Sequence, residues 1–527
     1  LWRTQQGTPL RLKRLEANQI DAHLVRLANG DASWAADQAD APRQEKSTEL
    51  PQIETLVLRS GDIVYRDEML NIALKAHIAQ STESDNPLPW RATAAGEYRG
   101  AVVNLEAQAG ADLPLLMQTE ESPTLTPLRL SGRVGSTRLD FDGATGALWA
   151  GQDLRGTLTV RGASLRTSGK PLGLTLPNSP PFRLRGVIAR VGPVWSLVTQ
   201  DATVGSSALT AAMQYDTRTS PPTLSGKLGG RRLAFADLAP VIGADKAPKK
   251  ANRVLPDEPF DLPSLAQMNA NILVDLSQLD FGTPAIAPMT DLKGHLLLED
   301  SRLTLSNLSA RVAGGLLTGS TRLQAKQQPP RWDAALRFAE VDIQRWLRGL
   351  QKNDAPGRDG APTYLSGTLN AKVSLTGQGN SVANVLGCGN GQLELDLVDG
   401  KMSQLITEAI GLDAAQALGI LISGDVPLTL TCARAEALIQ DGVVKSRYAV
   451  LDNKDSTLHI QGGASLKTES LQLRVVAEPK DFSPLSLRSP LNVTGSFKQP
   501  QVSVEAKGLV ARVAGALVLG AIAPPAA

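Results

Sequence analysis

Thr55-Leu56-Val57-Leu58-Arg59-Ser60-Gly61-Asp62-Ile63-Val64-Tyr65 is the stretch that decides the fold class. Leucine, valine and isoleucine alternate here with polar residues around a central glycine. Similar stretches begin at Leu128, Ser301 and Gln392, so the pattern recurs along most of the chain. Alternation with a period of two gives a β-strand one apolar face and one polar face. The sequence therefore predicts a mostly β protein without alternating helices.

A sheet that continues over hundreds of residues must cover its apolar face with something. We expect an elongated, twisted antiparallel β-sheet that curls into a U-shaped apolar groove, with short interspersed helices. Acyl chains are the natural ligand of such a groove, because burying each methylene group contributes about 0.8 kcal/mol without directional contacts. The alternative is that the same leucines form the dry core of a sandwich. The residues expected to line the groove are Leu56, Leu58, Leu303, Leu305, Leu393, Leu395, Leu397, Leu428, Leu430, Leu458, Ile460, Leu471 and Leu473.

Length and composition limit the classes of protein that the chain can belong to. Its 527 residues exceed one ordinary core, so several domains or one repetitive structure are expected. Aromatic residues make up only 4% of the chain, although large cores usually depend on them for burial. The formal net charge is +2, and the sequence holds no block of basic residues. This balance argues against nucleic acid as a partner.

Proline-rich and polar segments divide the β pattern into three similar blocks. Blocks of this kind that repeat along a chain suggest a solenoid-like array in which neighbours share a core. Short helices are expected at 235–242 and 341–351, and the strongest helical pattern covers 402–422. The predicted division is an N-terminal block at 1–243, a linker at 244–263, a middle block at 264–352, a linker at 353–364 and a C-terminal block at 365–527.

Catalytic and metal-binding signatures are missing from the sequence. We find no Gly-x-Ser-x-Gly elbow, no phosphate-binding loop and no His-Glu-x-x-His motif. The four histidines are scattered, and none has the spacing of a metal ligand. Acidic pairs such as Asp140/Asp142 and Glu394/Asp396 share one strand face, opposite leucines, and are expected to lie in solvent. We therefore expect no enzyme, no catalytic residue, no metal and no cofactor.

The two cysteines leave two interpretations open. Cys388 and Cys432 lie 44 residues apart, and they can form a disulfide if the compartment is oxidising. Alternatively, they are free thiols, with Cys432 buried in a strand.

From Leu365 onward the order of motifs resembles that of the AsmA family of Gram-negative envelope proteins. The most specific element is 479–491, Pro-Lys-Asp-Phe-Ser-Pro-Leu-Ser-Leu-Arg-Ser-Pro-Leu. Asp399-Gly400-Lys401-Met402-Ser403 and the segment around Cys432 precede it in the family's order. Earlier elements that are similar to the family include 29–34 and 61–67. The resemblance extends over essentially the whole chain.

The resemblance implies a location, a function and a set of partners. Such proteins have a periplasmic body and an N-terminal inner-membrane helix, which would lie upstream of Leu1. They are regarded as bridge-like lipid transfer proteins. We therefore expect a protein that conducts or chaperones phospholipids between the inner and outer membranes and supports outer-membrane homeostasis. The alternative is a scaffold that assists assembly of outer-membrane proteins by adding a strand at an open sheet edge.

The C-terminal segment 507–523 is rich in alanine and glycine. Leu509, Val513 and Leu517 fall on one helical face, which predicts an amphipathic helix. Such a helix either plugs the end of the groove or touches the outer membrane, where its basic residues would favour anionic lipid. It could equally be a tail that packs on the last strands.

Overall fold

Nearly all of the described chain forms β-strands. The computed structural model describes residues 11–12, 15–33, 52–53, 56–81, 86–110, 125–146, 153–172, 174, 176, 178–238, 255, 257, 259–260, 262–282, 286–346, 365–403, 427–480 and 490–504. Strands take 71% of these residues and helices 6%. The chain divides into two units, Leu1–Ser225 and Gly226–Ala527. We call them the N-terminal unit and the C-terminal unit and describe each by itself.

The N-terminal unit contains strands that are mostly nine to twelve residues long. Its main strands are β2 (Leu15–Arg26), β4 (Leu56–Asp67), β5 (Ile72–Gln80), β6 (Trp90–Tyr98), β7 (Ala101–Ala109), β8 (Thr126–Val134), β9 (Thr137–Thr145), β10 (Leu154–Gly162), β11 (Phe182–Val191), β12 (Val194–Val204) and β13 (Ser207–Asp216). Two short strands, β1 (Arg11–Leu12) and β3 (Gln52–Ile53), pair with each other. A short helix, α1 (Leu165–Gly169), and a 3₁₀ turn, η2 (Lys170–Leu172), lie between β10 and β11.

The C-terminal unit repeats this architecture. Strand β14 (Thr223–Ala234) crosses the division between the units. The strands that follow are β15 (Asn269–Asp280), β16 (Met289–Glu299), β17 (Arg302–Val312), β18 (Gly315–Gln324), β19 (Arg331–Asp342), β20 (Leu365–Gln378), β21 (Asn390–Ser403), β22 (Pro427–Gln440), β23 (Val443–Asn453), β24 (Ser456–Ser465), β25 (Ser470–Pro479), β26 (Leu491–Ser496) and β27 (Pro500–Val504). The helical turns are η3 (Phe235–Leu238), η4 (Pro263–Ala266), α2 (Ile343–Trp346) and α3 (Val382–Gly387).

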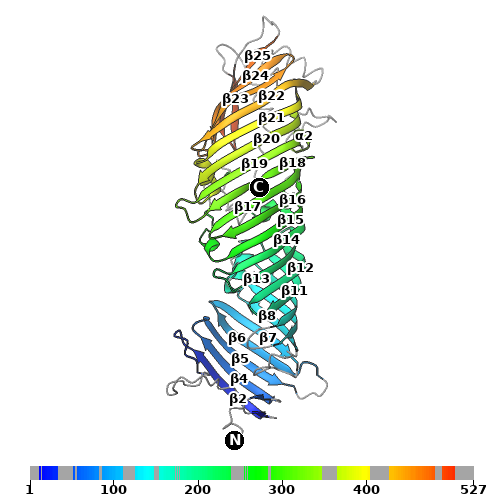
Figure 1. Ribbon diagram of the computed structural model, residues 1–527, viewed down its shortest axis with the longest axis vertical. Helices are drawn as coiled ribbons and strands as arrows, with labels where there is room; N and C mark the ends of the chain where they lie inside the picture. The colour runs from blue at the N-terminus through cyan, green and yellow to red at the C-terminus, as the bar shows by residue number, and fades with distance from the viewer. Residues whose placement is uncertain are drawn as a thin grey trace. The chain divides into compact units, whose positions relative to one another are not determined.

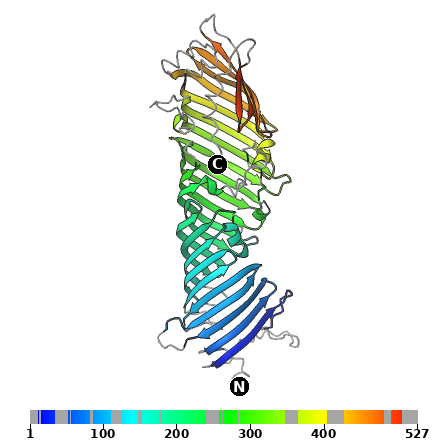
Figure 2. The same cartoon turned by 180° about the vertical axis from the view of Figure 1, so that it is seen from behind.

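Each unit is a curled, open sheet whose strands follow one another in sequence order (Figures 1 and 2). From β4 to β13 and from β15 to β27, every described pair of neighbours is antiparallel. Period-two alternation with short turns produces this result, since antiparallel neighbours need only a hairpin between them. The predicted fold class is thus confirmed.

One pair of main strands departs from the predicted antiparallel arrangement. Strands β2 and β4 are parallel, with Arg26 directly beside Asp67. Parallel neighbours need a crossover of a dozen or more residues, and 29 residues separate these two strands. The sequence expectation missed this pair because the segment between the strands carries no periodic pattern.

Several of the predicted helices fall partly or wholly outside the described residues. The turn predicted at 235–242 begins as the 3₁₀ turn η3, and 239–242 lie outside the described residues. In the segment 341–351, β19 continues through Asp342, α2 follows it, and 347–351 lie outside the described residues. Met402 and Ser403 belong to β21, so the strongest predicted helix cannot begin there, and the rest of it lies outside the described residues. The predicted C-terminal helix also lies outside them. The three-block division stays a prediction, because most of both linkers is likewise outside.

Glycine allows the strands to bend in the middle of the sheet. Gly132 lies inside β8 with a φ of +151°, a conformation that residues with a Cβ rarely adopt. A Cβ added there would lie 2.1 Å from the backbone oxygen of Asn104 on β7. In the C-terminal unit, Gly319 has a φ of +159°, and a Cβ added to it would lie 2.2 Å from the oxygen of Ala335. Both units therefore use close backbone approach at an interior glycine.

Candidate functional site

A row of apolar residues crosses all main strands of the N-terminal unit in direct register. Each member faces the next across a strand pair, so the side chains lie on one face of the sheet. Ten of the eleven are alanine, leucine, isoleucine or valine, and the remaining one is Gly132. We call this row the N-terminal apolar row. Its members are Ala22, Ile63, Ala76, Ala94, Leu105, Gly132, Leu139, Val160, Leu184, Ala202 and Leu209.

An equivalent row crosses the C-terminal unit from β15 to β27. Only Thr321 among its thirteen members is polar. We call it the C-terminal apolar row. Its members are Ile272, Leu296, Leu305, Thr321, Ala334, Leu375, Gly391, Ile439, Val444, Ala464, Leu471, Gly495 and Pro500.

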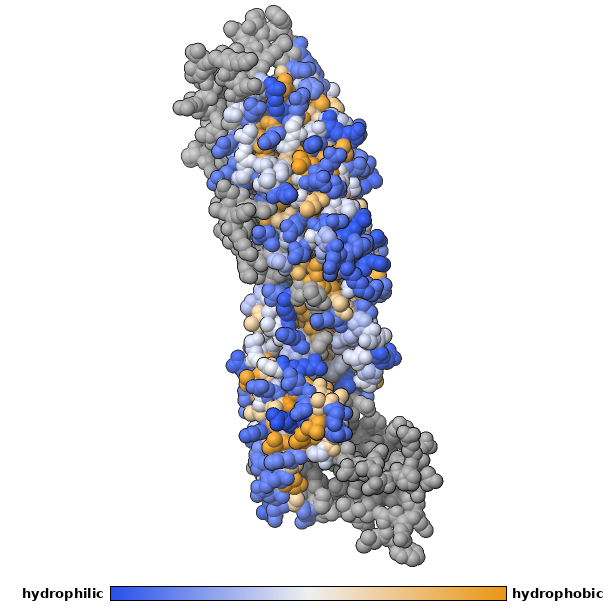
Figure 3. Space-filling model, turned by 90° about the vertical axis from the view of Figure 1, so that its left-hand side faces the viewer, coloured by the Kyte–Doolittle hydropathy of each residue, from blue (hydrophilic) through white to orange (hydrophobic). Residues whose placement is uncertain are grey.

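The rows are not buried as a dry core would be. Every member of the N-terminal row is only half-buried, and in the C-terminal row Ile439 alone is buried. Tight packing does occur in this chain, since Val312 and Val341 of the C-terminal unit are completely buried. Protein interiors are close-packed, so within the described part of the chain these rows of leucines and alanines are not packed as tightly as a protein core. Apolar patches bordered by polar residues are visible on the molecular surface (Figure 3).

The residues predicted to line a groove lie on these apolar faces wherever their side chains are described. Leu305 and Leu471 are members of the C-terminal row. Leu397, Leu430 and Leu458 come together in one cluster around Met402 and Ala433. The others are distributed over neighbouring register positions: Leu303 faces Leu298 and Leu323, Leu393 and Leu395 face Val373 and Ala371, Leu428 faces Met402, Ile460 faces Val475, and Leu473 faces Gly462 and Val493.

Burial differs among the predicted groove residues. Leu428, Leu430 and Leu458 are buried, whereas Leu303, Leu305 and the three leucines of β21 are half-buried. In the N-terminal unit, Leu58 packs with Trp90 and Ala109 in a small buried cluster. Leu56 lies in β4 opposite Leu15. Contact of any of these residues with lipid stays a prediction.

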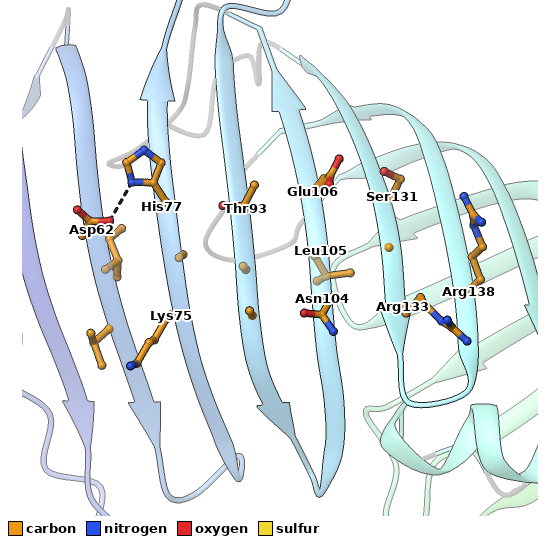
Figure 4. Close-up of a pocket in the computed structure, with 16 residues that line it drawn as sticks. Asp62, Lys75, His77, Thr93, Asn104, Leu105, Glu106, Ser131, Arg133 and Arg138 are labelled. Carbon is orange, nitrogen blue, oxygen red and sulfur yellow. Dashed lines mark hydrogen bonds and ion pairs between the residues drawn. The ribbon is translucent and has the colours of Figure 1, made fainter.

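The polar face of the N-terminal unit carries a shallow depression of about 650 Å³ over β4–β9 (Figure 4). The Nδ1 atom of His77 lies 2.8 Å from a carboxylate oxygen of Asp62, and both side chains are more than half exposed. Thr93, Glu106 and Ser131 continue the same register row on the next strands. In the part of the chain that the structure describes, no hydroxyl group is hydrogen-bonded to His77. Among the described residues, the His77–Asp62 pair therefore has no hydroxyl nucleophile positioned beside it, as acyl transfer requires.

A buried ion pair closes the end of the parallel strands β2 and β4. Asp67 is fully buried and accepts hydrogen bonds from the Arg26 guanidinium, from the Tyr65 hydroxyl at 2.8 Å and from the Leu70 backbone N–H at 2.9 Å. The Arg26 hydrogen bond is the main cause that lowers the pKa of Asp67 to about 2. Burial raises the pKa of Tyr65. The motif 61–67 thus contributes a structural lock between strands that are distant in sequence.

The acidic pairs lie on the polar face, where each carboxylate has a basic neighbour. Asp140 and Asp142 approach Arg138 and Arg129 at 3.8 and 3.4 Å. On β21, Glu394 pairs with Lys372 and Asp396 with Arg434, both at 3.1 Å. The expectation that these acids lie on the solvent side is confirmed.

Both cysteines are free and exposed. This resolves the open alternatives in favour of free thiols, but the expected burial of Cys432 is wrong, because it lies on the exposed face of β22. Within the described ranges, no three histidine, cysteine or acidic side chains form a group that could hold a metal ion. No helix among the described residues is long and apolar enough to cross a membrane.

Comparison with known proteins supports the resemblance that the motifs indicate. The sequence model of the AsmA family matches residues 197–447. The chain is also 27% identical to the AsmA family protein YhjG of Escherichia coli (strain K12) over 561 aligned positions, covering 97% of this chain and 79% of that protein. No solved structure matches the chain. The predicted resemblance to the AsmA family is therefore confirmed, although the most specific stretch, 479–491, lies beyond the residues matched by the family model.

Proposed function

We propose that this AsmA-like envelope protein binds phospholipids by their acyl chains along its apolar rows and conducts or chaperones them between the inner and outer membranes. The observation that supports the proposal is the half-burial of both apolar rows across the strands of their units. An acyl chain gains about 0.8 kcal/mol for each methylene group that it buries, and it requires no directional partner. A continuous row can therefore hold a chain at many successive positions.

Movement along the face follows from the same physics. Adjacent strands lie about 4.8 Å apart, so a chain that shifts by one strand exchanges one set of aliphatic contacts for a similar set. Ala76, Ala94 and Ala202 each contribute only a methyl group to the N-terminal row. Headgroups would remain in water, and no step needs a catalytic side chain. The periplasm and an inner-membrane anchor are part of this proposal.

Lipid analysis of the protein purified without detergent tests the proposal. We expect phospholipid to co-purify with the wild-type chain. In the double variant Leu105→Ser/Leu305→Ser, which changes one leucine of each apolar row, bound lipid should fall severalfold with the fold retained. The matched control is Leu273→Ser/Leu316→Ser, because these leucines are 46% and 44% exposed on the polar face. Absence of lipid from the wild type, or equal loss in both variants, would contradict the proposal.

A scaffold for outer-membrane protein assembly is the second candidate function. It is supported by the strands at the sheet edges: among the described residues, β27 pairs only with β26. An edge strand presents unpaired backbone groups that can accept a strand from another chain. Lipid-free protein that captures unfolded outer-membrane proteins through β27 would favour this function over lipid transfer.

A further inference from the structure

Four arginines lie side by side on the polar face of the N-terminal unit. Arg133 on β8 faces Arg138 on β9, Arg138 faces Arg161 on β10, and Arg161 faces Arg183 on β11. We call this set the arginine ladder. All four side chains are exposed. With about 4.8 Å between strands, the ladder places four guanidinium groups along about 14 Å.

Three of the four ladder arginines have no carboxylate partner among the described residues. Like charges directly opposite each other destabilise a strand pair. Arg138 approaches Asp140 at 3.8 Å, but no carboxylate in the described chain pairs with Arg133, Arg161 or Arg183. Over β8–β11 the polar face carries seven arginines and only two aspartates. An external anion would therefore relieve a repulsion that the folded chain otherwise retains.

The depression on the polar face lies at one end of the arginine ladder. Its lining includes Arg133 and Arg138, and the same register row extends through Asn104 to Lys75 (Figure 4). Guanidinium groups bind phosphate in bidentate fashion, and lysine and asparagine side chains add further donors. The ladder and the depression thus offer several phosphate-binding donors on one surface.

Exposed valines near the arginine ladder indicate that its anionic partner also offers an apolar region. Val187 and Val198 are direct neighbours on β11 and β12, and they are 58% and 48% exposed on the same face as the ladder. Val102, on the far side of the ladder, is 59% exposed. A soluble acidic peptide gains little from such valines. A lipid surface offers phosphates to the arginines and its interfacial region to the valines.

We propose that the arginine ladder docks the N-terminal unit onto the surface of a membrane rich in anionic phospholipid. Docking uses the polar face and is separate from the acyl-chain binding proposed for the apolar rows. It would hold the unit against a bilayer by many weak contacts that salt screens. The valines would enter the headgroup region beside the arginines.

Vesicle sedimentation of the full chain tests this proposal. The vesicles contain phosphatidylcholine alone or phosphatidylcholine with phosphatidylglycerol. We expect the wild type to bind the anionic vesicles at least tenfold more tightly, with binding that weakens as salt rises. The triple variant Arg133→Ser/Arg161→Ser/Arg183→Ser should lose most of this preference, a drop of more than tenfold in the partition coefficient.

The matched control removes the same charge from the other unit. Arg331→Ser/Lys372→Ser/Arg434→Ser deletes three cations that are paired with carboxylates on the polar face. We expect less than a twofold effect on vesicle binding. If either triple variant fails to fold by circular dichroism, Arg161→Ser is compared with Arg434→Ser, with a severalfold loss expected only for the former.

Three outcomes would overturn the proposal: equal affinity of the wild type for both vesicles, equal losses in the ladder and control variants, or binding to polyglutamate with no binding to vesicles. The single variant Leu305→Ser, which changes the apolar row of the other unit, separates this proposal from the lipid-cargo function. It should lose part of the co-purifying lipid while its binding to anionic vesicles is unchanged.

Discussion

The two units share an apolar face but differ in how their polar faces arrange charge. In the C-terminal unit, cations of the polar face have carboxylate partners on neighbouring strands: Lys372 pairs with Glu394, Arg434 with Asp396, and Arg447 with Glu436 at 2.5 Å. In the N-terminal unit, Arg133, Arg138, Arg161 and Arg183 face one another across three strand pairs. Apart from the parallel pair β2/β4, neighbouring main strands are antiparallel in both units, and both units carry an apolar row.

The difference indicates which features serve the whole protein and which serve one unit. A continuous apolar row in each unit fits a role that operates along the chain, such as holding acyl chains. Cross-strand pairs of opposite charge are the ordinary, mildly stabilising solution for a solvated face. Like charges that face each other in the described part of the C-terminal unit form single pairs, such as Arg337 with Lys372. The run of four in the N-terminal unit is longer, so it points to a local role. The following predictions test this contrast.

The largest expected effect concerns the buried ion pair of the N-terminal unit. Asp67→Ala removes a fully buried carboxylate and leaves Arg26 without its partner. The free energy of unfolding should fall by about 3 kcal/mol, because Asp67 accepts hydrogen bonds from Arg26, Tyr65 and Leu70 that are all lost. Lys372→Ala, which breaks an exposed pair in the C-terminal unit, should change it by less than about 1 kcal/mol. Urea unfolding monitored by circular dichroism measures both, and equal effects would contradict the assignment.

Interior glycines should matter alike in the two units. Gly132→Ala would place a Cβ 2.1 Å from the Asn104 oxygen, and Gly319→Ala would place one 2.2 Å from the Ala335 oxygen. We expect each to lower stability by about 2 kcal/mol, because the strand must shift and the positive φ becomes strained. Gly282→Ala is the control, since its φ is +72° but nothing lies within 4 Å of the added atom. If Gly282→Ala lowers stability as much as Gly132→Ala does, the positive φ alone, and not the close contact, causes the effect.

Acid should weaken the Asp67 lock within a narrow pH range. The Arg26 hydrogen bond lowers the pKa of Asp67 from 3.8 to about 2, so the folded state binds this proton less readily than the unfolded chain. The stabilisation is therefore complete above pH 4 and is lost as the pH falls toward 2. The stability of the wild type minus that of Asp67→Asn should be constant from pH 7 to 5 and shrink below pH 4. A difference that instead shrinks on going from pH 5 to 7 would contradict this sign.

The smallest expected effect is a change in stability that has opposite signs in the two units. Arg161→Gln relieves repulsion from Arg138 and Arg183, so stability should rise by up to about 0.5 kcal/mol. Arg434→Gln removes the partner of Asp396, so stability should fall by a similar amount. Thermal unfolding at low salt resolves the two, and high salt should diminish both changes. Destabilisation by Arg161→Gln would mean that Arg161 itself has a counterion within the protein.

The fold class and much of the apolar face could be predicted from the sequence, because period-two alternation depends only on local residues. Leucines were easy to select as candidates, whereas Ala76, Ala94 and Gly132 belong to the same row without being conspicuous in the sequence. Row membership depends on cross-strand register, which the turns set. Where a connection is irregular, as between β2 and β4, register and even strand direction could not be predicted.

The arginine ladder also could be predicted only where a short turn sets the register. Val134-Gly135-Ser136-Thr137 joins β8 and β9 by a two-residue turn, so the pairing of Arg133 with Arg138 could have been predicted from sequence. The pairing of Arg161 with Arg183 could not, because the residues between β10 and β11 include α1 and η2. Helix α3 could not be predicted either, because a six-residue helix carries too little periodicity.

Photo-crosslinking in cells tests the central claim, that the half-buried apolar rows hold acyl chains, most directly. A photoreactive residue is placed at Leu105 and at Leu305, one in each row, and at Leu273 and Leu316 on the polar face of the C-terminal unit, away from the arginine ladder. After irradiation, mass spectrometry identifies the captured molecules. The account predicts phospholipid adducts at Leu105 and Leu305 and few at Leu273 and Leu316. Intact, well-expressed protein without lipid adducts at either row position, or with equal adducts on both faces, would contradict it.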